Sequence, residues 1–249
     1  MGSALTAYAD LLERFAIATT GRMRRGQHGA VLAISGAPFG SLNTIFSPSP
    51  DPSPDELAAL AGSENWDVPW SIQVPGVPSP LVTEVAARHG LTEVTPQPLM
   101  IRPAGQGLPT DPPIDSLNVR PVSADELGLY TETLAAGFEV PYEAFGWLNV
   151  PSITKIEGVT LDLVELGGVP VGTGMTAVSG DLTGIFNVST LPRYRRRGYG
   201  RAVTMEMIRR GFAAGAPTAY LVASEIGESV YEAAGFRTEE YLSIITAPA

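Results

Sequence analysis

Apolar residues recur along the chain with two spacings, one typical of amphipathic helices and the other of short strands. In the first half, helical spacing predicts a helix over residues 5–19, a helix that begins at Ser53 with proline at its first position, and a helix over 79–88. Short apolar runs predict strands at 30–35, 41–46, 70–74 and 94–102. Helices and strands alternate, so we expect an α/β (α+β) fold.

A second series of helices and strands follows residues 103–113, where Pro and Gly without periodicity predict a linker. Ser123 and Glu126 have the spacing of a capping box and predict the start of a helix. The further elements expected are a short helix over 141–150 and strands at 117–122, 159–166, 170–178, 183–190, 218–223 and 240–246. We therefore predict two domains, residues 1–110 and residues 115–249.

The segment 187–201 carries the clearest chemical signal. Its sequence, Asn-Val-Ser-Thr-Leu-Pro-Arg-Tyr-Arg-Arg-Arg-Gly-Tyr-Gly-Arg, predicts the end of a strand, a tight basic turn and the start of a helix. N–H groups at a helix N-terminus have no partner within the helix, so such a turn binds anions. Gly198 and Gly200 let the backbone approach a ligand where a Cβ would collide. Positive charge comes from Arg193, Arg195, Arg196, Arg197 and Arg201, and a pyrophosphate fits this combination best.

The turn resembles that of a known family. Arg195-x-x-Gly198-x-Gly200 is similar to the (Gln/Arg)-x-x-Gly-x-(Gly/Ala) turn with which the GNAT superfamily of N-acetyltransferases holds the pyrophosphate of acetyl-coenzyme A. No Gly-Lys-Ser/Thr follows, so it is not a Walker loop, and the first glycine of a dinucleotide fingerprint is missing. Farther along, Tyr231-Glu-Ala-Ala-Gly-Phe236 precedes a final strand, and GNAT domains close in the same way.

The resemblance implies a GNAT fold, with a central mixed, mostly antiparallel sheet flanked by helices. The first half shows a weaker likeness. The run Trp70 to Val74, a helix, His89-Gly90-Leu91 and an apolar strand follow one another there as the elements of 220–246 do. It lacks an Arg-rich Gly-x-Gly turn. We therefore expect a smaller, degenerate GNAT-like N-terminal domain that walls the substrate pocket and binds no second coenzyme. An unrelated N-terminal extension is the alternative.

The resemblance also implies roles for single residues. The backbone N–H of Val188 would stabilise the developing oxyanion, and the Tyr231 hydroxyl would act as general acid toward the leaving thiolate. Ser224 lies where many relatives carry an asparagine that hydrogen-bonds the coenzyme. The expected coenzyme-binding residues are Val188, Ser189, Thr190, Arg195, Arg196, Arg197, Gly198, Tyr199, Gly200, Arg201 and Ser224.

The general base is the least defined part of the predicted site, because residues 182–190 contain no carboxylate. Glu139 and Glu143 lie between the first two helices of the second half, where the family lines its amine site. Glu225 follows the strand that precedes Tyr231. Glu143 and Glu225 are thus candidate catalytic residues beside Tyr231 and Val188, and a chain of water molecules is the alternative.

Composition narrows the chemistry further. The formal net charge is -10 and the arginine cluster is local, which argues against a nucleic-acid partner. There is no cysteine, and His28 and His89 are the only histidines, so neither a metal site nor a cysteine nucleophile is expected. No apolar run is long enough to span a membrane, and no signal pattern opens the chain. We expect a cytoplasmic protein, and its preference for Arg, Ala, Gly and Pro indicates a high-GC bacterium.

Together these observations favour an acyltransferase that moves an acetyl group from acetyl-coenzyme A to a primary amine by direct attack in a ternary complex. The preferred acceptor is a small-molecule amine, and the protein is expected to be a monomer or homodimer without a membrane partner. Two alternatives stay open. One is modification of a protein N-terminus or lysine, and the other is a coenzyme A-binding sensor or interaction module without turnover.

Overall fold

The computed structural model describes residues 2–107, 114–224 and 227–248. The chain forms two compact units, one made of Met1–Leu99 with Glu239–Ala249 and the other of Met100–Thr238. It passes from the first unit to the second within one strand and returns within another, so the end of the chain belongs to the first unit. Residues 108–113 lie outside the described ranges, and the division into domains 1–110 and 115–249 stays a prediction.

The first unit alternates helices and strands, in keeping with its sequence pattern. Its helices are α1 (Gly2–Thr19), α2 (Pro54–Ala61) and α3 (Pro80–Ala87). Its strand order is β1-β2-β3-β4-β11-β5. These strands are β1 (Arg22–Arg25), β2 (Val31–Ile34), β3 (Asn43–Phe46), β4 (Ser71–Pro75), β5 (Glu93–Arg102) and β11 (Arg237–Thr246). The side chains of Ser53 and Ser79 cap α2 and α3, which confirms both predicted helix starts.

Strand β1 has no counterpart among the strands that the apolar pattern predicts. It pairs antiparallel with β2 at the end of the strand order, and its residues Arg22 and Arg25 form ion pairs. Arg22 contacts Asp67 at 2.8 Å and Glu64 at 3.1 Å, and Arg25 contacts Asp10 at 2.5 Å. Charged side chains are common on edge strands, where they discourage pairing with other chains. A strand of this kind carries no apolar alternation to detect.

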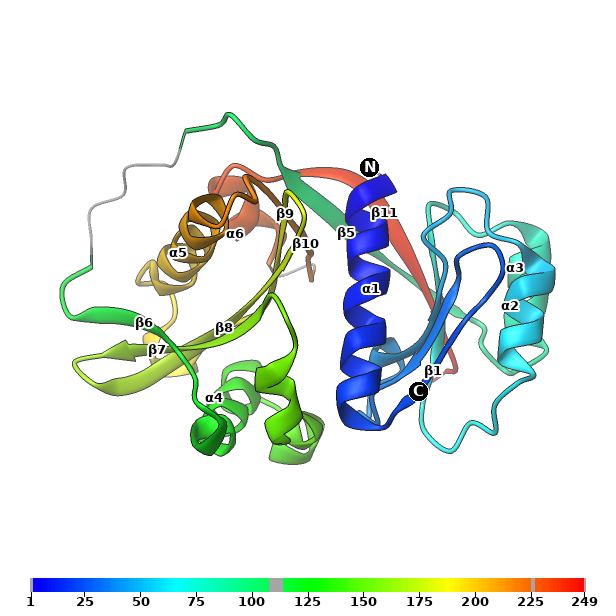
Figure 1. Ribbon diagram of the computed structural model, residues 1–249, viewed down its shortest axis with the longest axis horizontal. Helices are drawn as coiled ribbons and strands as arrows, with labels where there is room; N and C mark the ends of the chain where they lie inside the picture. Colours follow the sequence, from blue (N-terminus) through cyan, green and yellow to red (C-terminus); the bar gives the residue numbers. More distant parts are fainter. Residues whose placement is uncertain (1, 108–113, 225–226, 249) are drawn as a thin grey trace. The chain divides into compact units, whose positions relative to one another are not determined.

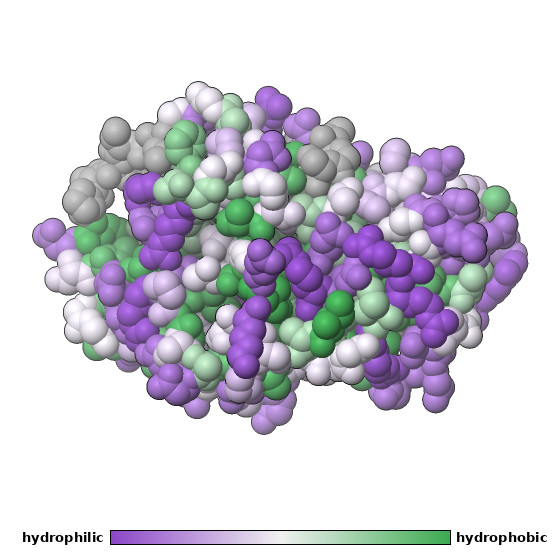
Figure 2. Space-filling model, viewed as in Figure 1, coloured by the Kyte–Doolittle hydropathy of each residue, from purple (hydrophilic) through white to green (hydrophobic). Residues whose placement is uncertain are grey.

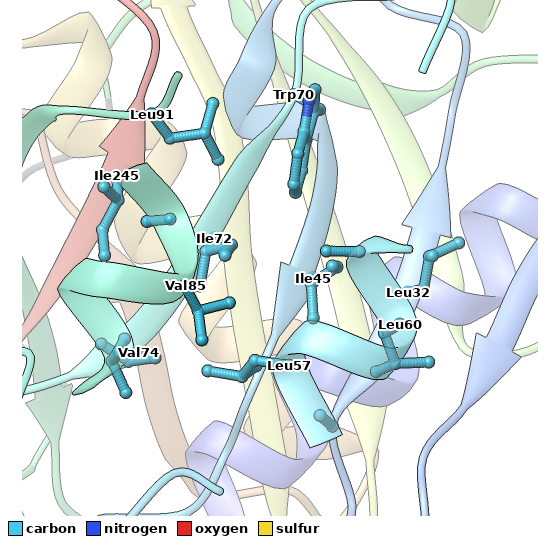
Figure 3. Packing of buried hydrophobic residues seen from close by; sticks show 14 of the residues in the cluster. Leu32, Ile45, Leu57, Leu60, Trp70, Ile72, Val74, Val85, Leu91 and Ile245 are labelled. Atoms are coloured by element: carbon cyan, nitrogen blue, oxygen red, sulfur yellow. The ribbon is translucent and has the colours of Figure 1, made fainter. Parts of the chain in front are cut away.

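Helices α2 and α3 pack on one face of these strands and close the core of the first unit. Leu57 and Leu60 of α2 and Val85 of α3 point toward side chains of the strands (Figure 3). The strand residues that meet them are Leu32, Ile45, Ile72, Val74 and Ile245, with Trp70 and Leu91 at the margin. Ile245 comes from β11, so the last strand of the chain contributes to this core.

The second unit has the strand order β10-β9-β8-β7-β6. These strands are β6 (Leu117–Pro121), β7 (Val159–Leu166), β8 (Val169–Ser179), β9 (Leu182–Thr190) and β10 (Thr218–Val222). The pairs from β6 to β9 are antiparallel, whereas β9 and β10 are parallel. Helices α4 (Leu127–Phe138) and α5 (Tyr199–Ala213) cover opposite faces of β8 and β9, and the short helix α6 (Glu228–Ala233) follows β10 (Figure 1). The sheet is mixed and mostly antiparallel, as expected.

Two details of the second unit test the sequence analysis directly. The capping box of Ser123 and Glu126 is present, with hydrogen bonds in both directions. Residues 141–150, by contrast, do not form the predicted helix. They contain separate 3-10 turns at Tyr142–Ala144 and Gly146–Leu148. Gly146 begins the second of these turns, and a glycine inside a segment of this length disfavours one continuous helix.

The parallel crossover of the second unit has a counterpart in the first. Strand β3, helix α2 and the parallel strand β4 follow one another as β9, α5 and β10 do. The first crossover helix has 8 residues and the second has 15. The side chain of Ser53 occupies an N–H at the start of α2, whereas Gly198 caps α5 without a side chain. This repetition is compatible with a degenerate N-terminal half whose helix N-terminus offers fewer free donors.

Hydrophilic residues dominate the face seen in Figure 2, and hydrophobic residues lie among them in small groups. Single apolar side chains are exposed, among them Leu81 at the start of α3, which is 60% exposed. Scattered apolar residues of this kind are normal on a folded surface. In the part of the chain that the structure describes, no helix is long and apolar enough to cross a membrane.

The packing of α2 leads to a stability prediction. Leu57→Ala removes a fully buried side chain from the core of the first unit, and we expect it to lower the free energy of unfolding by about 3 kcal/mol. Leu81→Ala makes the same change on an exposed position and should cost less than about 0.5 kcal/mol. Urea unfolding followed by circular dichroism measures both. Equal losses for the two variants would contradict this description of the core.

Candidate active site

Strand β9 is irregular near its C-terminal end. Its register with β8 shifts between Thr173 and Met175, so that Asn187 and Val188 together face Gly174. This two-to-one arrangement is a β-bulge, which leaves one residue out of the hydrogen-bond ladder. Asn187 accordingly has a left-handed φ of 51°. The bulge disrupts regular pairing beside Val188.

The other neighbour of β9 pairs with it over a short distance. Residues 182–184 of β9 are opposite 218–220 of β10. Strand β9 continues to Thr190 and β10 to Val222, but no further pairs join them within the described ranges. Main-chain groups on this side of β9 beyond Gly184 therefore have no strand partner. An extended ligand can bind such groups in the way an added strand does.

Helix α5 begins directly after the end of β9 and the basic turn. Its N-cap is Gly198, which has a φ of 81°, and no side chain caps the helix. The first helical hydrogen bond runs from the Ala202 N–H to the Gly198 carbonyl at 2.9 Å. The N–H groups of Tyr199 and Gly200 thus precede the bonded part of the helix. This uncapped N-terminus, with its partial positive charge, is suited to an anion.

Arg195 connects the turn to its surroundings. Its guanidinium donates to the carbonyls of Thr190 at 3.2 Å and Gly137 at 2.7 Å, and it contacts the carboxylate of Glu139 at 2.6 Å. The side chain therefore ties the turn to the end of β9 and to the C-terminus of α4. Since the guanidinium is engaged with protein oxygens, its contact with a pyrophosphate stays a prediction.

The other arginines of the turn have different settings. The guanidinium groups of Arg193 and Arg197 lie over the Tyr194 ring, 4.9 and 5.7 Å from its centroid. Arg201 donates to a backbone carbonyl of α6. Arg196 has a φ of 61°, is exposed, and has no side-chain partner within the described residues. Of this group, Arg196 is thus the arginine with the greatest freedom to contact an anion.

Tyr231 lies on α6, where its ring packs against the core of the second unit. The ring centroid is 5.9 Å from that of Phe236. Burial raises the pKa of Tyr231 to about 12, so its hydroxyl is a neutral donor at ordinary pH. Ser224 is exposed just beyond β10, and its carbonyl accepts from the Gly227 N–H at 2.9 Å.

The glutamates considered as general bases occupy unlike environments. Glu139 ends α4 with a left-handed φ of 58°, and its carboxylate is paired with Arg195. Glu143 is exposed on a 3-10 turn and has no side-chain partner in the part of the chain described. Glu225 lies outside the described residues. Among the residues with described positions, no group of His, Asp and Glu could hold a metal ion.

The polar residues that hold the bulge are not predicted from the sequence. Asn187 donates through Nδ2 to the Tyr130 hydroxyl at 3.2 Å, and the Thr173 hydroxyl donates to the Asn187 carbonyl at 2.8 Å. Tyr130 and Thr173 are fully buried. The one available signal is an asparagine inside an otherwise apolar strand, because Asn tolerates positive φ better than most residues.

Comparisons with known proteins find similar sequences and folds. Residues 132–236 match the model of the acetyltransferase (GNAT) family, and no curated protein matches the chain. The fold resembles a GCN5-related N-acetyltransferase from Kribbella flavida, with a TM-score of 0.67 and 18% identity over 98% of this chain and 94% of that one. It also resembles a GNAT-family protein from Novosphingobium aromaticivorans, with a TM-score of 0.56 and 18% identity over 86% and 85% of the two chains. These likenesses confirm the predicted fold class.

The setting of Tyr231 leads to a pH prediction. An unfolded tyrosine ionises near pH 10, whereas the pKa of folded Tyr231 is about 12. Burial of the neutral phenol therefore contributes stability that is fully present below pH 10 and is lost as the pH rises toward 12. The difference in ultraviolet absorbance between the wild type and Tyr231→Phe should show no ionisation up to about pH 11. The same difference in urea should titrate near pH 10, and coincident curves would contradict the burial argument.

Proposed function

We propose that the chain, whose residues 132–236 match the GNAT acetyltransferase family, is an acyltransferase that acetylates a primary amine on a small molecule. The acetyl donor is acetyl-coenzyme A, as the family implies, and attack occurs directly in a ternary complex. We also propose a cytoplasmic bacterial protein, monomeric or homodimeric, that uses no metal and acts without nucleic acid or a membrane.

The proposal rests on backbone groups between the bulge in β9 and the start of α5 that are engaged neither by β10 nor by helical hydrogen bonds. Beyond Gly184, β9 is no longer paired with β10, and the helix that follows begins with an uncapped N-terminus. An extended, apolar arm ending in a pyrophosphate needs these two features in this order. Strand-like hydrogen bonds hold such an arm, and helix N–H groups hold its anionic end. The residues present therefore fit coenzyme A.

Each predicted coenzyme-binding residue has a place in this proposal. Val188, Ser189 and Thr190 would bind the arm through their main chain. The turn from Arg195 to Arg201 would bind the pyrophosphate, with N–H groups of Gly198, Tyr199 and Gly200 as the main donors. Arg196, Arg197 and Arg201 add charge around them. Ser224 would contact the arm from the end of β10. Its side chain is shorter than the asparagine that many relatives carry at this position.

The reaction itself needs three further contributions. Acetyl-coenzyme A supplies a thioester carbonyl that a neutral amine can attack. The Val188 N–H would stabilise the negative charge that develops on the carbonyl oxygen, and Tyr231 would donate its proton to the leaving sulfur. Burial keeps the Tyr231 hydroxyl protonated at ordinary pH, so that a proton is present to donate, although the raised pKa makes it a weaker acid than an exposed tyrosine.

The base that deprotonates the amine is less defined. Glu139 is already paired with Arg195, so its carboxylate is less available than that of the exposed Glu143. We therefore favour Glu143 among the described acids and keep Glu225 as a second candidate. A water chain leading to solvent would serve the same purpose without a dedicated side chain.

The test combines calorimetry with a turnover assay. We expect acetyl-coenzyme A to bind and free coenzyme A to be released when a panel of small amines is added. Release only with peptides bearing a free N-terminus or lysine would favour protein modification instead. Binding without release by either group of acceptors would favour a coenzyme sensor. Absence of binding would contradict the site itself.

Gly198 offers a sharp test of the pyrophosphate position. Gly198→Asp places a carboxylate at the N-terminus of α5, so we expect the affinity for acetyl-coenzyme A to fall at least tenfold, or about 1.4 kcal/mol. Gly215→Asp is the matched control, because Gly215 follows the same helix at its other end with a φ of 83°. Both variants carry similar backbone strain. Calorimetry showing equal affinities for the two would refute the assignment.

Tyr231 is tested by its effect on turnover. Tyr231→Phe removes only the hydroxyl, so it should lower kcat by about 100-fold, in the usual range for a general acid. The dissociation constant of acetyl-coenzyme A should change less than twofold, because the ring still packs against Phe236. Unchanged kcat with the responding amine would exclude Tyr231 as the acid. Phe is the best-matched replacement, since it keeps the shape of the ring.

A further inference from the structure

We propose that Thr173 is a positioning residue that orients and polarises the Val188 N–H, and that Tyr130 and Asn187 hold the bulge in which it acts. The inference rests on the proposed function, since it concerns how the oxyanion donor of that reaction is held in place. Its basis is a group of hydrogen bonds around the bulge in β9 that the sequence analysis does not anticipate.

The peptide group between residues 187 and 188 links Thr173 to Val188. The Thr173 hydroxyl donates to the Asn187 carbonyl at 2.8 Å. A trans peptide is planar, so the carbonyl of residue 187 and the N–H of residue 188 point in opposite directions. The chain has no cis peptide bond among its described residues. The bond from Thr173 therefore directs the Val188 N–H away from β8.

This direction matters because β9 lies between β8 and β10. On the side of β10, pairing with β9 ends at Gly184, and among the described residues no strand pairs with the main chain beyond that point. A donor directed away from β8 is thus available to a ligand rather than to the sheet. A hydrogen bond to the carbonyl also polarises the whole peptide group, which makes its N–H a stronger donor.

The proton of Thr173 can be assigned from its two contacts. Its hydroxyl is 2.8 Å from the Ser189 hydroxyl as well as from the Asn187 carbonyl. A hydroxyl has one proton, and a carbonyl can only accept. Thr173 must therefore donate to Asn187 and accept from Ser189. The short chain from Ser189 through Thr173 to the carbonyl has a single direction, which keeps the peptide group in one orientation.

Tyr130 and Asn187 maintain the backbone conformation that this arrangement requires. A left-handed φ inside a strand persists only where the surroundings hold it. The Asn187 amide donates to the Tyr130 hydroxyl at 3.2 Å, and that hydroxyl donates to the Gly174 carbonyl at 3.4 Å. Gly174 faces the bulge from β8. Tyr130, on α4, therefore connects both strands of the bulge through one buried hydroxyl.

The experiment compares two ligands that differ in the carbonyl oxygen. S-ethyl-coenzyme A has the same arm and pyrophosphate as acetyl-coenzyme A but offers no oxygen to the Val188 N–H. One well-placed hydrogen bond should make the wild type bind acetyl-coenzyme A about fivefold more tightly than the thioether. In Thr173→Val the ratio should fall toward one, while the affinity for S-ethyl-coenzyme A changes less than twofold.

Three further variants make the result specific. Thr173→Ser restores the hydroxyl and should restore the ratio, whereas Tyr130→Phe should lower it. Thr131→Val is the matched control, because Thr131 is also fully buried and its hydroxyl also donates to a backbone carbonyl, that of Leu127 at 2.8 Å. Its ratio should equal that of the wild type. Tyr130→Phe and Thr173→Ser keep the comparison valid if Thr173→Val does not fold.

The outcomes separate this inference from the proposed function. If the wild type binds neither ligand, the proposed function fails and the inference fails with it. If both ligands bind and the ratio is unchanged in Thr173→Val and Tyr130→Phe, the coenzyme site stands and the positioning role is overturned. A wild-type ratio of one would likewise overturn it, because no hydrogen bond to the carbonyl would then exist.

Discussion

The candidate site in the second unit depends on main-chain N–H and C=O groups of β9 that are not used for pairing within the sheet. A strand inside a sheet normally uses its N–H and C=O groups on both sides, and an unused buried group is costly. Here the bulge disturbs the pairing with β8, and the pairing with β10 is short. The polar groups of Tyr130, Asn187 and Thr173 compensate on the buried side. The remaining groups of β9 on the side of β10 are open to a ligand, so the irregular end of the strand can contribute backbone groups to the candidate site.

The two crossovers of the chain illustrate the same constraint in opposite ways. At the start of α2, the Ser53 side chain occupies a backbone donor, which stabilises the helix and leaves less for an anion. At the start of α5, Gly198 leaves that position without a side chain. Stability lost at the second helix end is offset in part by Arg195, which ties the turn to α4 and β9 through three contacts. A site that binds its ligand through backbone groups thus needs neighbouring side chains to hold the conformation of the turn.

The sequence predicts those parts of the fold that have a local cause. Apolar periodicity, the caps at Ser53 and Ser79 and the capping box at Ser123 locate most helices and strands because each signal acts within a few residues. The basic turn before α5 is recognisable for the same reason. Strand β1 is missed because ion pairs replace apolar alternation there, and 141–150 because short 3-10 turns resemble a helix in spacing.

What the sequence does not reveal are the contacts between distant segments. The Asn187 side chain meets a tyrosine that lies 57 positions earlier, and only the register of β8 and β9 shows that two residues face Gly174. Likewise, the position of Arg195 in the motif predicts a contact with phosphate, whereas the partners of its guanidinium in the structure belong to the C-terminus of α4 and the end of β9. Register and helix packing decide these pairings, and neither has a local signature.

The position of β11 between β4 and β5 has a consequence for biosynthesis. Its residues 239–246 are made about 140 residues after β5, yet Ile245 belongs to the core of the first unit. During translation, β4 therefore lacks its neighbour on that side until residues 239–246 leave the ribosome. The first unit cannot be complete until all residues of the second unit, 100–238, have been made.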